Sequence, residues 1–290
     1  MTDAARPRHR ELPTDPWALA PMGKAFDGTL EAGLAELGLL DSMAAGPSAR
    51  RSYEAHARLL REWNLSINLT AIREPAEVAR RHTCDSLSAA PLLAELVEPG
   101  ASLLDVGSGG GYPGLPLAAG LPLSRVGLLD SVGKKARFLA VAGAAVAAVL
   151  AEGEGDGGAD GAAGRPASVT IEAIAERAED LAEEADQREA WDVVVARAVG
   201  PLAEVLELGL PLTREGGVVV AWKREEEGGG LLAELQDAGS IIRAAGGGRP
   251  RVRAVEAAGL AGHRLVLVPK ERTTPIAYPR PASVRVRRRR

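Results

Sequence analysis

One stretch of the chain decides the fold: Leu103-Leu104-Asp105-Val106-Gly107-Ser108-Gly109-Gly110-Gly111-Tyr112-Pro113-Gly114. An apolar run ends in an acid, Asp105, and then breaks into glycines, as happens where a buried strand ends in a tight turn. Because glycine has no Cβ, a ligand can approach this backbone closely, and we expect the N–H groups of the loop to point into open space. Nucleotide-like cofactors bind at this carboxyl edge of open α/β sheets, so the stretch predicts a cofactor site.

Two glycine spacings compete within this stretch. Gly109-x-Gly111-x-x-Gly114 fits the dinucleotide fingerprint, whereas Gly107-x-Gly109-x-Gly111 after Asp105 is typical of S-adenosylmethionine (SAM) methyltransferases. The first glycine should follow the strand directly, as Gly107 does, so the methyltransferase spacing is favoured. A second acid, Asp130, follows the next apolar run and would bind a ribose hydroxyl in either cofactor class. An NAD-dependent dehydrogenase and an ordinary glycine turn stay open as alternatives.

From about Ala101 onward the sequence alternates predicted strands and helices, with helical stretches between the first five strands. The last two strands fit an antiparallel hairpin. Seven strands with a late hairpin predict an α/β fold of the class I SAM-dependent methyltransferase type, which is Rossmann-like with a mostly parallel sheet. The predicted strands are 102–106, 124–129, 168–174, 192–196, 217–222, 252–257 and 264–269.

The chain divides into four predicted parts. Residues 1–24 carry prolines and charges and are expected to be disordered. Residues 25–96 predict an N-terminal helical cap, and residues 97–270 a SAM-binding domain with a flexible glycine- and acid-rich insert at 152–166. Residues 271–290 form a basic tail with arginines at 280, 285 and 287–290. Such a tail either supplies phosphate contacts or is a solvated end without a role.

The composition bounds the function. The chain has 290 residues, of which 46% are hydrophobic, so it can bury a sizeable core, and its net charge is −4. Its single cysteine, Cys84, excludes an internal disulfide and indicates a reducing compartment. There is no apolar signal region, and the longest apolar run, 138–150, is too short to span a bilayer. We expect a cytoplasmic monomer with no metal site and no membrane partner.

The residues near the predicted site limit the methyl acceptor. Enzymes that methylate exocyclic amines carry an Asn/Asp-Pro-Pro-aromatic motif after the fourth strand, where this chain reads Ala-Arg-Ala-Val-Gly-Pro over 196–201. Methylation of pyrimidine carbon 5 needs a cysteine nucleophile, but Cys84 lies upstream of the cofactor strand and is more simply a small buried hydrophobe. An acceptor with its own lone pair remains, such as guanine N7, for which catalysis is mainly positioning and electrostatics.

Four basic side chains could contact the substrate. Arg197 and Arg177 follow predicted strands and could bind a phosphate or guanine O6, although a surface ion pair is the alternative for each. Lys223 ends the fifth strand and could meet a phosphate or simply be solvated. His82, taken alone, is more simply structural than catalytic.

Several motifs then fall in one order along the chain, from about Tyr53 to Lys270. They are Glu62-Trp63-Asn64-Leu65-Ser66-Ile67-Asn68-Leu69-Thr70-Ala71-Ile72, Arg81-His82-Thr83-Cys84-Asp85-Ser86, the loop Asp105 to Gly114, Leu129-Asp130-Ser131 with Lys134, Lys135 and Phe138-Leu139, Arg177-Ala178-Glu179, Ala196-Arg197-Ala198, and His263-Arg264. In this order they resemble the bacterial 16S rRNA guanine-N7 methyltransferase G family, also called glucose-inhibited division protein B. Tyr112, where Phe or Leu is usual, and Arg224, where glycine is common, depart from the pattern.

The resemblance implies SAM-dependent methylation of N7 of one guanine, position 527, in the 16S rRNA of the small ribosomal subunit or its assembly intermediate. A SAM enzyme acting on another RNA or a small molecule, and a non-catalytic RNA-binding assembly factor, are the rival readings. The implied cofactor-binding residues are Asp105, Gly107, Ser108, Gly109, Gly111, Tyr112, Asp130, Ser131, Ala178, Glu179 and Arg197. The implied residues facing the RNA or the guanine are Asn68, His82, Arg177, Arg197 and Lys223.

Overall fold

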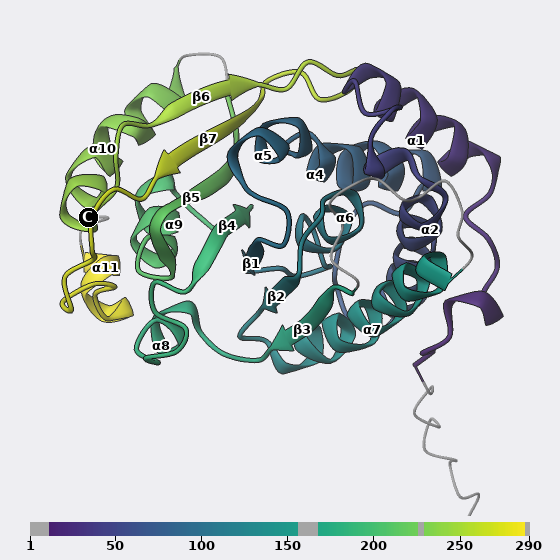
Figure 1. Cartoon of the computed structure of the whole chain (residues 1–290), viewed down its shortest axis with the longest axis horizontal. Helices are drawn as coiled ribbons and strands as arrows, with labels where there is room; N and C mark the ends of the chain where they lie inside the picture. The colour runs from purple at the N-terminus through teal and green to yellow at the C-terminus, as the bar shows by residue number, and fades with distance from the viewer. Residues whose placement is uncertain (1–11, 156–167, 226–228, 288–290) are drawn as a thin grey trace, which may run out of the picture.

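The computed structural model describes residues 12–155, 168–225 and 229–287, and it contains a seven-stranded sheet in the order β3-β2-β1-β4-β5-β7-β6 (Figure 1). The first five strands run parallel, while β7 is antiparallel to both β5 and β6. The strands are β1 (Ser102–Val106), β2 (Arg125–Leu129), β3 (Thr170–Ile174), β4 (Trp191–Arg197), β5 (Thr213–Arg224), β6 (Arg251–Ala254) and β7 (His263–Pro269).

The predicted class I methyltransferase fold is confirmed, since all seven predicted strands are present and the last two form the antiparallel hairpin. The largest difference is β5, which starts four residues before the predicted 217. Its early residue Thr213 pairs with Trp191 across an irregularity in the register with β4, and Gly216 interrupts the apolar pattern there with a left-handed φ of +80°. The polar and glycine residues at this start masked the strand in the sequence.

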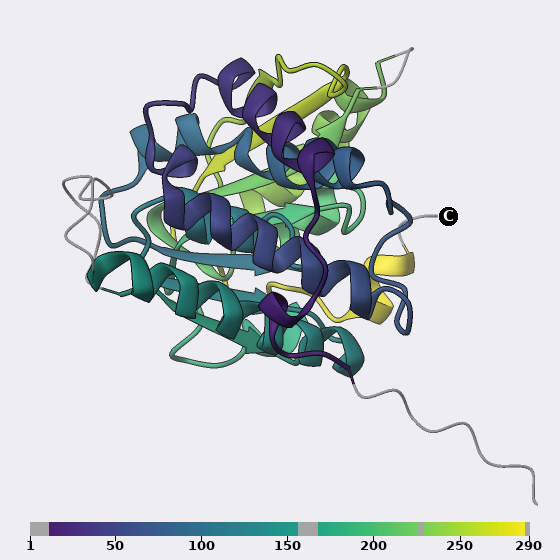
Figure 2. The same cartoon turned by 90° about the vertical axis from the view of Figure 1, so that its right-hand side faces the viewer.

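Helices cover both faces of the sheet, as Figures 1 and 2 show. Successive strand residues face opposite sides, so Leu103 and Val193 join one apolar core while Leu104 and Val194 join the other. The first core contains α6 (Gly114–Gly120) and α7 (Gly133–Gly155), and the second contains α8 (Ala178–Leu181), α9 (Leu202–Gly209) and α10 (Gly230–Ala244).

The N-terminal helices do not form a core of their own. Tyr53, Leu60 and Trp63 of α2 are buried in the same apolar core as residues of β1 and α7, and α2 lies along α7 (Figure 2). The cap therefore shares the sheet's core and helps to fix the sheet's first face. Its helices are α1 (Lys24–Glu36), α2 (Pro47–Trp63), α3 (Pro75–Val78), the π-helix η3 (Ala79–Cys84), α4 (Asp85–Leu87) and α5 (Ala90–Leu96).

The expected disorder of residues 1–24 is wrong for the part that the structure describes. Residues 12–23 run beside α2 and include the 3₁₀ turn η1 (Pro16–Ala18). Side chains of α2 satisfy this segment's carbonyl groups: Trp63 Nε1 donates to Pro13 O at 2.8 Å and Arg58 Nη1 to Leu19 O at 3.2 Å. Residues 1–11 lie outside the described ranges.

Helix α7 contains the apolar run 138–150, whose length predicted no membrane span. The stretch Gly133–Gly153 is 21 residues long with a mean hydropathy of 1.6, so by length and composition alone it would pass as a span. In the structure 44% of this window is buried, and the helix packs against α2 and β3, which accounts for its buried apolar residues. The first residues of the predicted insert, 152–155, belong to α7, and the rest of the insert lies outside the described ranges.

The basic tail is partly built into the fold. Arg280 donates to both carboxylate oxygens of the buried Glu207, at 2.7 and 2.6 Å, and Arg285 of α11 (Ala282–Arg287) donates to Glu179 at 2.8 Å. Two of the tail's arginines are therefore paired with carboxylates of the folded domain, so at these two positions the tail is not a solvated end.

A glycine in β2 tests how tightly the central sheet is packed. A Cβ added to Gly127 would lie 2.7 Å from Trp191 Cη2 and 2.8 Å from Leu104 Cδ1, both in fully buried side chains. We expect Gly127→Ala to lower the free energy of unfolding by about 1–3 kcal/mol, because an overfilled core must shift. Gly133→Ala is the matched control, since nothing lies within 4 Å of its added Cβ. Urea denaturation of both variants checks this, and equal stabilities would contradict it.

Candidate functional site

The glycine loop between β1 and α6 is held by the end of β2. Gly107, Gly109 and Gly111 all adopt left-handed φ angles, of +73°, +56° and +82°. The N–H groups of Gly107 and Ser108 donate to Leu129 O, and that of Gly109 donates to Asp130 Oδ2 at 3.1 Å. The expectation that these N–H groups point into open space is therefore wrong, because the neighbouring strand end uses them. Gly107 is nevertheless exposed and Gly109 half-buried, so the backbone of the turn is open to a ligand.

Asp105 lies fully buried beneath this loop. Its Oδ2 accepts from Ser108 Oγ at 2.6 Å and from Gly114 N at 2.9 Å, whereas its Oδ1 is buried without a hydrogen-bond partner among the described residues. Burial raises the pKa of Asp105 to about 6, against the donors that favour the charged form. A buried carboxylate oxygen that lacks a donor fits a cationic ligand group that donates a hydrogen bond, as the ammonium group of SAM does.

Asp130 and Ser131 follow β2 at the same edge of the sheet. Besides Gly109 N, the Asp130 carboxylate accepts from Val132 N at 2.9 Å and lies 3.6 Å from Lys135 Nζ. Each of its oxygens can accept a further bond, so a ribose hydroxyl is compatible with this arrangement. Ser131 is exposed.

A stack of rings joins the glycine loop to the cap. Tyr112 lies between His56 of α2 and His82 of η3, with ring centroids 4.3 and 4.7 Å away, and the guanidinium of Arg197 lies 5.4 Å from its centroid. His56 Nε2 is 2.7 Å from Gly110 O and so donates to the loop's backbone. The sequence-predicted Tyr112, His82 and Arg197 are thus brought together.

Arg197, at the carboxyl end of β4, is bound on three sides. Its Nη1 donates to Asp85 Oδ2 at 2.9 Å and to Arg81 O at 3.2 Å, and its Nη2 approaches His82 Nδ1 at 3.3 Å. The other oxygen of Asp85 lies 2.8 Å from Nδ1 of His263 in β7. One carboxylate of the cap therefore links β4 to β7.

Both histidines of the stack are neutral at pH 7. Burial lowers the pKa of His56 to about 4 and that of His82 to about 3, and the Arg197 charge acts in the same direction. Because Arg197 donates to Nδ1 of His82, the proton of that ring sits on Nε2, which donates to Thr70 Oγ1 at 2.7 Å. His82 is therefore a positioning group with both nitrogens engaged, and it carries no charge for a phosphate.

The remaining predicted residues lie apart from this cluster. Asn68 is exposed in the loop after α2, and Arg177 is exposed at the start of α8. Lys223 Nζ donates to Gly200 O at 2.8 Å and pairs with Glu234 at 2.5 Å, so it holds the loop after β4. Ala178 is buried at the start of α8, and Glu179 pairs with Arg285.

Three members of the cluster were not predicted as site residues from the sequence: His56, Asp85 and His263. Asp85 and His263 belong to two of the motifs named above. His82 and Asp85 are three residues apart in a helical segment, and this spacing places both on one face. His56 had no comparable signal, because an isolated histidine on a helix gives no hint of the loop that it meets. Within the described ranges, no three His, Cys, Asp or Glu side chains converge as a metal site would need.

Comparison with known proteins gives one consistent result. Residues 50–149 and 165–237 match the family described as rRNA small subunit methyltransferase G. A Ribosomal RNA small subunit methyltransferase G from Symbiobacterium thermophilum is 39% identical over 90% of this chain and 96% of its own length. Proteins of the same name from Dehalococcoides mccartyi and Roseiflexus castenholzii are 36% and 37% identical, covering 87% and 82% of this chain and 94% and 92% of their own lengths.

Removal of the charge on Asp85 tests the link between the cap and the sheet. The side chains of Asp85 and Arg197 are only 5% and 14% exposed, so Asp85→Asn leaves a shielded guanidinium without its counter-charge. We expect the free energy of unfolding to fall by about 2–4 kcal/mol. Glu77→Gln is the control, because its pair with Arg81 is about half exposed and should matter little. Urea denaturation of both variants decides, and an equal loss in the control would refute the link.

Proposed function

The chain belongs to the rRNA small subunit methyltransferase G family, and we propose that it transfers a methyl group from SAM to N7 of one guanine in 16S rRNA, the position-527 guanine by family resemblance. The observation that carries the proposal is the juxtaposition of two features at one sheet edge. One is the buried Asp105 oxygen without a donor, beneath the open glycine loop. The other is the Tyr112–His82–Arg197 cluster beside that loop.

SAM supplies a methyl group on a positively charged sulfur, and guanine N7 supplies its own lone pair. The protein then needs no base to remove a proton and no nucleophile of its own. The candidate site fits such a reaction, because neither His82 nor Cys84 is suited to these roles. His82 has both ring nitrogens engaged and a pKa of about 3, so it is a poor base. Cys84 is buried, and burial raises its thiol pKa to about 12, which argues against the cysteine chemistry of pyrimidine methylation.

Arg197 is the residue best placed to orient the guanine. A guanidinium has five N–H donors, and three are directed to Asp85, Arg81 and His82. The other two have no partner among the described residues and are available to a guanine O6 or a phosphate. Because Asp85, His82 and the Tyr112 ring hold the group in place, its orientation is set before the substrate arrives.

The proposal extends to the protein's partners and setting. Its substrate is the 16S rRNA, either in the small subunit or in an assembly intermediate, and it acts as a cytoplasmic monomer without a membrane. The exposed side chains of Asn68 and Arg177 are the proposed outer RNA contacts. Lys223 contributes through the loop that it holds after β4, and the implied cofactor residues Ser131, Ala178 and Glu179 remain part of the proposal.

Transfer of labelled methyl groups tests the function directly. The protein is incubated with labelled SAM and with 16S rRNA or 30S particles from a strain that lacks it, and the nucleosides of the product are analysed. Label in 7-methylguanosine at one site is the expected result. Label in another nucleoside would retain the methyltransferase and reject N7 of guanine. SAM binding without any transfer would favour a non-catalytic RNA-binding role.

Two variants separate positioning from covalent catalysis in that assay. Arg197→Ala should lower the rate of methyl transfer about a hundred-fold or more, because it removes preorganised donors at the acceptor. Cys84→Ser should retain a rate close to that of the unaltered protein, since lone-pair attack uses no thiol. A folded but inactive Cys84→Ser protein would overturn the proposed chemistry.

The pKa of Asp105 makes SAM binding depend on pH. A cationic ligand favours the ionised carboxylate, so below about pH 6 binding must first release a proton from Asp105. We expect the affinity for SAM to fall about ten-fold from pH 8 to pH 5, and the dependence to disappear in Asp105→Asn. The unliganded protein changes in the opposite direction: the raised folded pKa contributes stability at low pH that is lost as pH rises through about 6. Calorimetric titration with SAM at several pH values measures the affinity, and urea denaturation of the unliganded protein at the same pH values measures the stability. An unchanged pH dependence of the SAM affinity in Asp105→Asn would contradict the assignment.

A further inference from the structure

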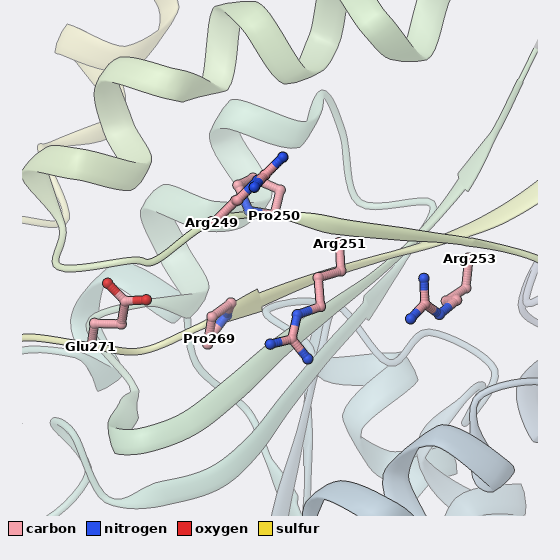
Figure 3. A pocket seen from close by; sticks show the side chains of 6 residues that line it. All are labelled: Arg249, Pro250, Arg251, Arg253, Pro269 and Glu271. Carbon is pink, nitrogen blue, oxygen red and sulfur yellow. The ribbon is translucent and has the colours of Figure 1, made fainter.

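The outer edge of the sheet carries a row of arginines that the proposed active site does not use. Arg251 and Arg253 lie two residues apart on β6, the edge strand, and Arg249 comes just before it (Figure 3). All three side chains are exposed, and together with Pro250, Pro269 and Glu271 they line an open hollow of about 390 Å³. We call Arg249, Arg251 and Arg253 the β6 arginine row.

The charge of this row is not neutralised by the fold. No hydrogen bond or ion pair joins any of the three guanidinium groups to another described residue. The one carboxylate of the hollow, Glu271, lies against the backbone of Gly248 at the end remote from Arg253 (Figure 3). By contrast, Arg280 and Arg285 of the tail are both paired with carboxylates. A local excess of positive charge therefore stands on a chain whose net charge is −4.

Two members of the row, Arg251 and Arg253, lie on the face of the sheet that carries the candidate site. Arg253 and Arg251 stand opposite Leu265 and Leu267 of β7, which are buried in the core that the cap shares. Side chains two residues apart on a strand face the same side, so His263, which reaches Asp85, shares this face with Leu265. The last residue of β6, Ala254, pairs with Arg264 beside His263, so the row runs towards the site's edge of the sheet.

Protection of an edge strand is the plain alternative, because charged side chains on such strands prevent pairing with other chains. For that role the charged side chains need not lie on one face of the sheet or point towards the candidate site. Here Arg251 and Arg253 lie about 7 Å apart on the face of the site, and arginine binds phosphate oxygens with two parallel donors.

We propose that the β6 arginine row binds the phosphate backbone of the RNA substrate, at a site separate from the catalytic pocket. The inference rests on the proposed rRNA methyltransferase function and adds a second anchoring surface to it. Contacts of this kind hold RNA without reading its sequence, so they act on affinity and its salt dependence and leave the methyl transfer step unchanged.

The test replaces all three residues, as Arg249→Gln, Arg251→Gln and Arg253→Gln together, and measures methyl transfer to 30S particles or 16S rRNA between 50 and 200 mM salt (about the range over which such contacts weaken). We expect KM for the RNA to rise about ten-fold or more, the salt slope of log affinity to fall by about 2–3, and kcat and SAM affinity to stay unchanged. Replacement of the three residues by lysine should restore most of the RNA affinity, because the charge is kept.

A charge-matched control replaces three exposed cations elsewhere that have no ion pair among the described residues, Lys24, Arg137 and Arg243, by glutamine, and should keep the KM of the unaltered protein. If the glutamine triple variant matches this control, the row serves edge protection only and the proposal is overturned. Light scattering reports aggregation, and should the triple variant aggregate, Arg251→Gln alone decides by its salt slope, expected to fall by about 1. If the unaltered protein does not methylate the rRNA, the proposed function is wrong. This outcome differs from failure of the inference about the row, in which the unaltered protein is active and the glutamine triple variant matches the control.

Discussion

The carboxylate of Asp85 is the interaction on which the site depends. It lies in the cap, yet its two oxygens bind Arg197 of β4 and His263 of β7, and its backbone carbonyl accepts from Trp222 Nε1 of β5 at 2.8 Å. Three strands of the sheet are thus tied to one residue of the cap. Arg197 in turn donates to a ring nitrogen of His82 and lies over the ring of Tyr112 in the glycine loop. The position of the loop therefore also depends on the Asp85 carboxylate. The cap is therefore part of the site's framework and has no separate core.

Local backbone strain gathers at the same place. Ala198, the residue after Arg197, has a left-handed φ of +59°, which costs a non-glycine residue about 1 kcal/mol or more. The turn that it makes brings Val199 against the loop, where a Cβ on Gly107 would lie 2.7 Å from Val199 Cγ2. Lys223 holds the next residue, Gly200, by its carbonyl oxygen. The end of β4 is thus bent to direct Arg197 towards the loop, and the surrounding packing maintains the bend.

The sequence predicted those parts that depend on local patterns. Seven strands, the late hairpin and the glycine turn follow from periodicity and from the conformational freedom of glycine, and they were found with small errors of boundary. The hydrogen-bond partners of the N–H groups in the turn could not be predicted, because they are Leu129 and Asp130, at the end of another strand. His56, Asp85 and His263 were missed as site members for the same reason, since each acts through a partner at least 50 residues away in the sequence. Residues 12–23 have a defined structure because side chains of α2 donate hydrogen bonds to them, and no local pattern in the sequence reveals these donors.

The basic residues of the chain show why charge density along a sequence is a poor guide to a polyanion's binding surface. The C-terminal tail is the densest basic segment, yet Arg280 and Arg285 are paired with Glu207 and Glu179. The arginines of β6 alternate with apolar or small residues and attract no notice in the sequence, but the strand's alternation puts Arg251 and Arg253 on one face with no carboxylate partner among the described residues. An arginine whose charge a carboxylate already neutralises releases few counterions when it meets a phosphate, whereas an exposed unpaired arginine releases them when it binds. What decides the binding surface is therefore which charges the fold leaves unpaired, and in the described part of this chain they include the β6 edge.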